Sequence, residues 1–143
     1  MYGSLDIAVS GMVAQRMRLD VISANLANRD TILDADGNPN PFRRKIAAFM
    51  PGDPSSKNAA GRELGVHLGG IGEDSAPFRK VWEPTSPHAR PDGDPDAGYV
   101  YYPNVDPVIE QISAVEAVRA YEANATAAEV TKTMMAQALR LLG

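Results

Sequence analysis

The sequence predicts a mainly α-helical protein whose long N- and C-terminal helices pair as a coiled-coil-like domain, with a loop-rich, β-containing middle. All eleven prolines lie between Pro39 and Pro107. Apolar residues recur at helical spacing on both sides of that segment. We therefore expect three parts: residues 1–30 as the first helix, 31–106 as the middle and 107–143 as the second helix.

The first helix is predicted from about Leu5 to Asn28, with Ser4 as its N-cap. Steps of three and four residues join a seam made of Leu5, Ala8, Met12, Gln15, Leu19, Ile22 and Leu26. Further apolar residues lie off this seam, so the helix needs several neighbours to cover it. Gly11 has two interpretations: a tolerated weak point in the helix, or the place where another backbone approaches closely.

The second helix has clear start signals. Asp106 can cap it, and Pro107 fits its first position, where the missing N–H does no harm. No Gly or Pro interrupts residues 108–142, which gives a helix of about 50 Å. Its second half carries a stripe of Ala123, Ala127, Val130, Met134, Ala138 and Leu141. Such a helix fits a terminal pair in a larger assembly; the alternative is a hairpin that covers the middle of a monomer.

The middle contains four short strand signals bounded by Gly, Pro and Asp. They are FRRKIAAF (42–49), LGVHLGGI (64–71), PFRKVWEP (77–84) and GYVYYP (98–103). The segments KNAAGRE (57–63) and SPHARPDGDPDAG (86–98) are expected to be loops. We therefore expect a small β element whose strands are connected by loops.

No catalytic, cofactor-binding or metal-binding constellation is found. The chain has no cysteine, and its formal net charge of -4 argues against a nucleic-acid partner. The acidic segments 34–40 and 92–98 lack the Gly and Glu that a calcium loop requires at its sixth and twelfth positions. His67 and His88 have no nearby acidic cluster, and the basic run 43–45 is interpreted as a solvated strand face.

Membrane and secretion signals are also missing from the sequence. No apolar run approaches the roughly 20 residues that span a bilayer, so no direct membrane insertion is expected. The first residues lack a basic segment and carry Asp6, which does not fit a cleaved secretory signal peptide.

Two distant motifs resemble the bacterial flagellar rod and hook proteins. SANLANRDT (23–31) follows an apolar helix, as at the N-terminus of that family, and RAYEAN (119–124) with TKTMM (131–135) resembles its C-terminal segment. YPNVD (102–106) and PFRRK (41–45) are similar in particular to the proximal-rod, or FlgC, type. The family's Thr-Pro-Gly-Tyr-like turn is replaced here by ILDADGNPNPFRRK, which also favours that type.

The resemblance implies an axial structural protein of the flagellar basal body rather than an enzyme. Its partners would be copies of itself, other rod proteins and neighbouring basal-body components. It would leave the cytoplasm unfolded through the flagellar type III export apparatus, without a cleaved signal, and assemble helically in the periplasmic rod. Alternatives are another axial protein, of the hook or distal rod, and a small enzyme or metal-binding protein.

The expected assembly interface lies on both terminal helices. It consists of Leu5, Met12, Leu19, Ile22, Asn25, Leu26, Asn28, Tyr121, Asn124, Val130, Met134 and Leu141. The amides of Asn25 and Asn28 would bond across subunits or cap the chain where the helix ends. The alternative is that these asparagines only terminate the helix.

Overall fold

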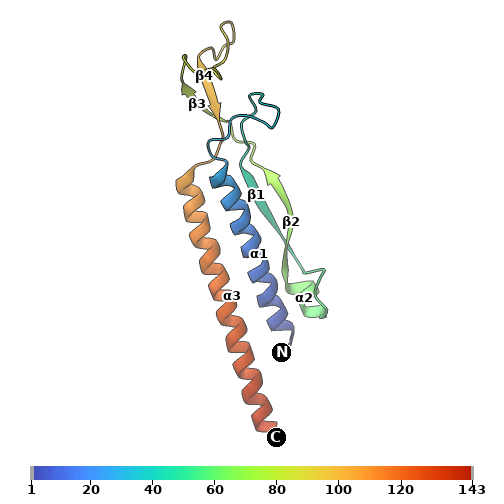
Figure 1. Cartoon of the computed structure of the whole chain (residues 1–143). Coiled ribbons are helices and arrows are strands. Elements are labelled where there is room, and N and C mark those ends of the chain that lie inside the picture. Colours follow the sequence, from blue (N-terminus) through green and yellow to red (C-terminus); the bar gives the residue numbers. More distant parts are fainter. Residues whose placement is uncertain (1, 143) are drawn as a thin grey trace.

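The computed structural model describes residues 2–142 and has the shape of a long stalk with a small tip at one end (Figure 1). The described residues form three helices and four strands, in the order α1 (Tyr2–Ala27), β1 (Lys45–Pro51), α2 (Ala59–Leu64), β2 (Val66–Glu73), β3 (Arg79–Trp82), β4 (Tyr99–Tyr102) and α3 (Pro107–Leu142). The predicted fold class is confirmed: two long terminal helices pack together, and the strands lie between them in the sequence.

Helices α1 and α3 run antiparallel and build the stalk, and α3 continues past the N-terminal end of α1 (Figure 1). Their contact is lined by small side chains, of which Ala8, Ala117 and Ala128 are buried. A Cβ atom at Gly11 would lie only 2.8 Å from Oδ1 of Asn124. A group from the other helix does approach Gly11 closely, but it is the side-chain amide of Asn124, so the expected approach of another backbone is wrong.

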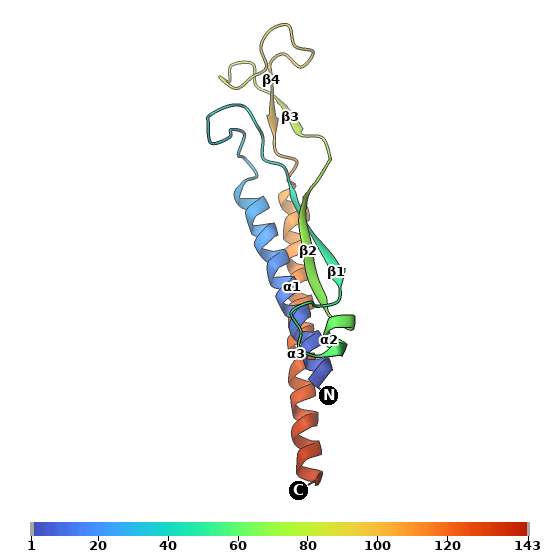
Figure 2. The same ribbon diagram turned by 90° about the vertical axis from the view of Figure 1, so that its right-hand side faces the viewer.

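The second layer of the stalk is a hairpin, β1 paired antiparallel with β2, which lies along α1 (Figure 2). The buried hydroxyl of Ser10 fastens this layer, because the Val66 N–H donates to Ser10 Oγ at 3.1 Å. Short helix α2 joins the two strands and contacts the first turns of α1. A Cβ at Gly3 would meet the Cβ of Ala60 at 2.7 Å, so a larger residue would not fit there.

The tip is a second antiparallel hairpin, β3 with β4, between two loops. Trp82 lies opposite Tyr99, and their rings meet edge to face at 5.0 Å. Val100 on the other face of β4 is only 2% exposed and forms the centre of the tip. Gly98 adopts φ +79°, and the Trp82 ring occupies the space that a Cβ there would need.

The expected elements are all present, with three corrections. All four strand signals form strands, but in two separate two-stranded sheets. Segment 57–63, expected as a loop, contributes most of α2. Helix α1 begins at Tyr2, so Ser4 is a helical residue and not the N-cap. Helices α1 and α2 pack against each other, and this packing stabilises helical residues that the local sequence signals do not indicate.

Asp106 and Pro107 act as predicted. The N–H of Val108 donates to Asp106 Oδ1 at 2.8 Å, and Pro107 is the first residue of α3.

The contact between Gly11 and Asn124 makes a prediction about stability. Gly11→Ala adds helix propensity worth about 1 kcal/mol, but its Cβ overlaps the Asn124 amide, which costs about 1–3 kcal/mol. In an Asn124→Ala background the overlap is gone, so the same substitution should raise the free energy of unfolding. Urea unfolding of the four chains measures the coupling; an equal effect of Gly11→Ala in both backgrounds would contradict the close contact.

Candidate functional site

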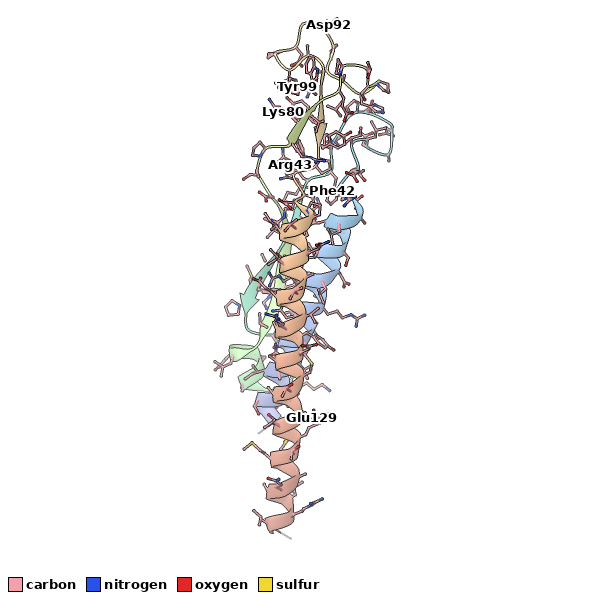
Figure 3. All side chains as sticks on the ribbon, turned by 90° about the vertical axis from the view of Figure 1, so that its left-hand side faces the viewer. Phe42, Arg43, Lys80, Asp92, Tyr99 and Glu129 are labelled. Carbon is pink, nitrogen blue, oxygen red and sulfur yellow. The ribbon has the colours of Figure 1, made fainter. Side chains whose placement is uncertain are left out.

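A polar cluster occupies the junction between stalk and tip, where α1 ends and β1 and α3 begin. We call it the neck cluster; its members are Asn25, Arg44, Asp74, Asn104 and Glu110. The labels of Phe42 and Arg43 in Figure 3 mark the position of this junction.

Glu110 is the centre of the neck cluster, and its residue is fully buried. Arg44 Nε donates to Glu110 Oε1 at 2.6 Å, and Asn25 Nδ2 donates to Glu110 Oε2 at 3.1 Å. Arg44 reaches further, with Nη1 at 3.3 Å from Asp74 Oδ2. A buried carboxylate is tolerated only when it is paired and hydrogen-bonded, so these contacts join α1, β1 and α3 at one point.

Both the Nδ2 and the Oδ1 atom of the Asn25 side chain form hydrogen bonds within the chain. Its Nδ2 donates to the Lys45 carbonyl at 2.8 Å, and the Lys45 N–H donates to its Oδ1 at 2.8 Å. The side chain thus gives the first residue of β1 the two hydrogen bonds that a neighbouring strand would give. The expectation that the Asn25 amide bonds across subunits needs correction, because the residue is 1% exposed and its amide is already bonded.

Asn28 behaves differently, three residues later. Its Nδ2 donates to the Ala24 carbonyl at 2.9 Å, and its Oδ1 accepts from the Thr31 hydroxyl at 3.2 Å. Both bonds are local to the last turn of α1, which ends at Ala27. The structure thus agrees with the interpretation of Asn28 as a helix terminator.

The neck also fastens the tip. Asn104 Oδ1 accepts the N–H of Arg44 at 2.9 Å, while its Nδ2 donates to the carbonyls of Asp74 and Ala76. Arg43 Nη1 donates to the same two carbonyls, and its guanidinium lies over the ring of Phe78, 4.3 Å from the centroid. Residues 43 and 44 are therefore connectors, which corrects the interpretation of the basic run as a solvated strand face.

Sequence reasoning missed Arg44 and Glu110 as a pair. In the sequence, Glu110 can be recognised only as an acidic residue in the first turn of α3, where its negative charge interacts favourably with the helix dipole. Nothing in the local sequence links it to an arginine 66 positions earlier.

The predicted interface residues fall into three groups. Ile22 and Asn25 are buried in the chain, and the half-buried Asn124 lies against Gly11. Leu5, Met12, Leu19, Leu26 and Asn28 are half-buried along α1. The remaining residues are exposed on α3: Tyr121, Val130, Met134 and Leu141. The exposed α3 group is available to another molecule.

The described residues offer little for other chemistry. A cavity of ≈ 530 Å³ in the tip is lined by prolines, aromatic rings, His88 and Arg90, with no carboxylate among its lining residues. Within residues 2–142 no three His, Asp or Glu side chains gather closely enough to hold a metal ion. None of the helices in this range has the length and apolar character to cross a bilayer.

The two asparagines should differ sharply in their effect on stability. Asn25→Leu leaves the Lys45 N–H and carbonyl and the Glu110 carboxylate short of partners in a buried place, at a cost of about 2–4 kcal/mol. Asn28→Leu removes only local bonds at the helix end, and its cost should stay below about 1 kcal/mol. Urea unfolding measures both, and similar losses would contradict the role given to Asn25.

Asp74 should make the neck sensitive to acid. The Ala76 N–H donates to Asp74 Oδ1, and this bond, with help from Arg44, holds the pKa of the carboxyl below its usual value. Because the folded pKa is lowered, the stabilisation is complete above the unfolded value of about 3.9 and is lost as the pH falls below it. Asp74→Asn should unfold with a weaker pH dependence between about pH 5 and 2; an unchanged slope would contradict this role.

Models of known protein families match both ends of the chain. Residues 5–32 match the family described as flagella basal body rod protein. Residues 96–141 match the family described as the C-terminal part of flagellar basal body rod FlgEFG proteins. These segments contain most of α1 and most of α3, together with β4, so the matches include both long helices of the stalk.

Relatives of the whole chain agree with these matches. The flagellar basal-body rod protein FlgC of Bacillus subtilis is 37% identical over 98% of this chain and 97% of its own length. FlgC of Borreliella burgdorferi is 37% identical over 99% of this chain and 97% of its own length. FlgC of Salmonella typhimurium is 39% identical over 95% of this chain and 93% of its own length. Because it is 37–39% identical to these proteins over nearly its whole length, the chain belongs to the FlgC family of flagellar basal-body rod proteins.

Proposed function

We propose that this rod protein is a subunit of the proximal rod, where it assembles helically with copies of itself and with other rod proteins into the shaft that transmits motor torque. Its neighbours in the basal body would be the further partners. The family is a structural one. The observation that carries the proposal is the uncovered apolar surface of the stalk.

That surface is unusual for an isolated chain. On α3 the aliphatic side chains Val108, Ile112 and Met134 are 57–63% exposed, and Leu141 is 88% exposed. On α1, Val9 and Val13 are 44% and 49% exposed. Contiguous exposed apolar surface of this kind marks a site of protein association. The stalk would be covered once it is packed among other stalks.

The route to this location is part of the proposal. A rod of the basal body lies in the periplasm, and export by the flagellar type III apparatus would bring the subunit there. A chain without cysteine would meet the oxidising periplasm without forming disulfides.

A purely structural role also fits the side chains, and we propose that the chain is not an enzyme. The buried polar groups of the neck bond to one another and to backbone, and Glu110 is closed off from solvent. They are placed to hold three elements together rather than to meet a substrate. The likeness to FlgC proteins over nearly the whole chain supports the proposed proximal position within the rod over the hook or distal rod.

Met134→Asp tests the proposal in cells that depend on this chain for their flagella. Because Met134 is exposed, the free subunit should fold and be exported normally, whereas a charge placed in a dry contact should cost several kcal/mol per subunit. We expect rods to be absent and motility lost. Electron microscopy of isolated basal bodies and swimming in soft agar measure the two effects.

Two control variants separate the stalk from the rest of the surface. Lys132→Asp changes a charge on α3 away from the apolar face, and Asp94→Lys changes a charge in the tip loop; both residues lie outside that face, and both variants should swim nearly normally. Normal rods in Met134→Asp, or intact flagella in cells that lack the chain altogether, would overturn the proposed function.

A further inference from the structure

Each long helix of the stalk carries an uncovered face with regular helical spacing. We call the first the α1 outer face: Val9, Val13, Arg16, Asp20, Ala24 and Ala27. The second is the α3 outer face: Ile112, Val115, Arg119, Ala123, Thr126, Val130 and Met134. All of these residues are exposed. Because every residue of both faces is exposed, the two faces do not cover each other within one chain.

The two faces have the same spacing when they are compared in opposite directions. From Val9 to Ala27 the steps along the α1 outer face are four, three, four, four and three residues. From Val130 back to Ile112 the steps along the α3 outer face are also four, three, four, four and three. An antiparallel contact that sets Val9 opposite Val130 therefore aligns every position of the α1 outer face.

The charges select this register. It places Asp20 opposite Arg119, and within the described chain neither side chain takes part in an ion pair. Moving the contact by about one helical turn in either direction would set Asp20 opposite Glu116 or Glu122. Those registers oppose like charges, which is unfavourable across a helix contact.

The sizes of the side chains fit the same register. Ile112 falls opposite Ala27 and Val115 opposite Ala24, so two large residues of the α3 outer face meet small residues of the α1 outer face. Ala24 also lines an apolar groove of ≈ 390 Å³ between α1 and β2, together with Met17 and Ile71. A branched side chain arriving opposite Ala24 would thus meet a hollow rather than a flat surface.

We propose that the α3 outer face of one copy packs antiparallel on the α1 outer face of a second copy, in the register that sets Asp20 opposite Arg119. The inference rests on the proposed function and names its contact. Because the two faces differ, the contact is head-to-tail: the first copy keeps its α1 outer face free and the second keeps its α3 outer face free, so further copies can add at both ends and the series does not close after two copies.

The register also covers the protruding end of α3. Within the chain Arg18 bonds to Glu116 and Gly11 meets Asn124. In the proposed contact Arg16 lies opposite Ala123, so the second copy is displaced by about four residues, or ~6 Å, toward the C-terminal end of α3. That is the end that extends past the chain's own α1 (Figure 1).

Cysteine cross-linking in assembled rods tests the contact, because the chain has no cysteine of its own. Cells co-express Val9→Cys and Val130→Cys chains in place of the natural one, and isolated basal bodies are oxidised. We expect disulfide-linked dimers that contain one chain of each kind, and none when either variant is present alone. The matched control is Val9→Cys with Val118→Cys, an exposed residue about three turns away on α3. Dimers in the control at the same yield, dimers from one variant alone, or none in the test pair would overturn the inference.

A charge exchange provides a second readout if the cysteine chains do not assemble. Asp20→Arg and Arg119→Asp should each lower swimming by about tenfold or more, and the combined variant should recover most of it. Full motility of the single variants, or no recovery in the double variant, would overturn the contact. Deletion of the chain distinguishes the two proposals: if flagella persist without it, the proposed function fails, whereas their loss together with motile single variants removes only this contact.

Discussion

The structure depends on one buried interaction, the ion pair between Arg44 and Glu110 together with the amide of Asn25. Three segments that are far apart in the sequence end at this point, and the partly buried guanidinium compensates the charge of the buried carboxylate. The same arginine continues to Asp74, and its backbone N–H to Asn104, so the tip is fastened by the residue that also fastens the stalk. Few apolar contacts would otherwise hold the tip to the helices.

In the stalk, small side chains lie between the two long helices and large aliphatic side chains of α3 lie on the outside. Alanines and Gly11 line the contact of α1 with α3, where they let the helices approach, while the larger aliphatic residues of α3 point outward. A monomer would gain more by the opposite arrangement, with the large residues inside. The observed arrangement leaves apolar surface exposed on the stalk, and in the proposed rod this surface would be covered by contacts between subunits.

In the proposed assembly, the neck keeps the tip at a fixed angle while the stalk makes the contacts between subunits. Torque passed between stalks would then reach the tip without the tip turning against the stalk. The hydrogen bonds of Asn104 and Arg43 to the carbonyls of Asp74 and Ala76 provide that connection with directional groups instead of a sliding apolar contact. Directional bonds fix an angle, whereas packed aliphatic side chains tolerate small rotations.

The sequence by itself determined both long helices, the cap of Asp106 on α3 and all four strands, because these follow from local spacing and from Pro and Gly. It also identified Asn25 and Asn28 as unusual, and Val130 and Met134 as apolar positions on a helix. Only the tertiary structure decided that Asn25 bonds to Lys45 while Asn28 ends the helix, since hydrogen-bond partners 20 positions apart leave no local signal. The Arg44–Glu110 pair could likewise be identified only from the tertiary structure, because the fold, and not the spacing in the sequence, brings those charges together.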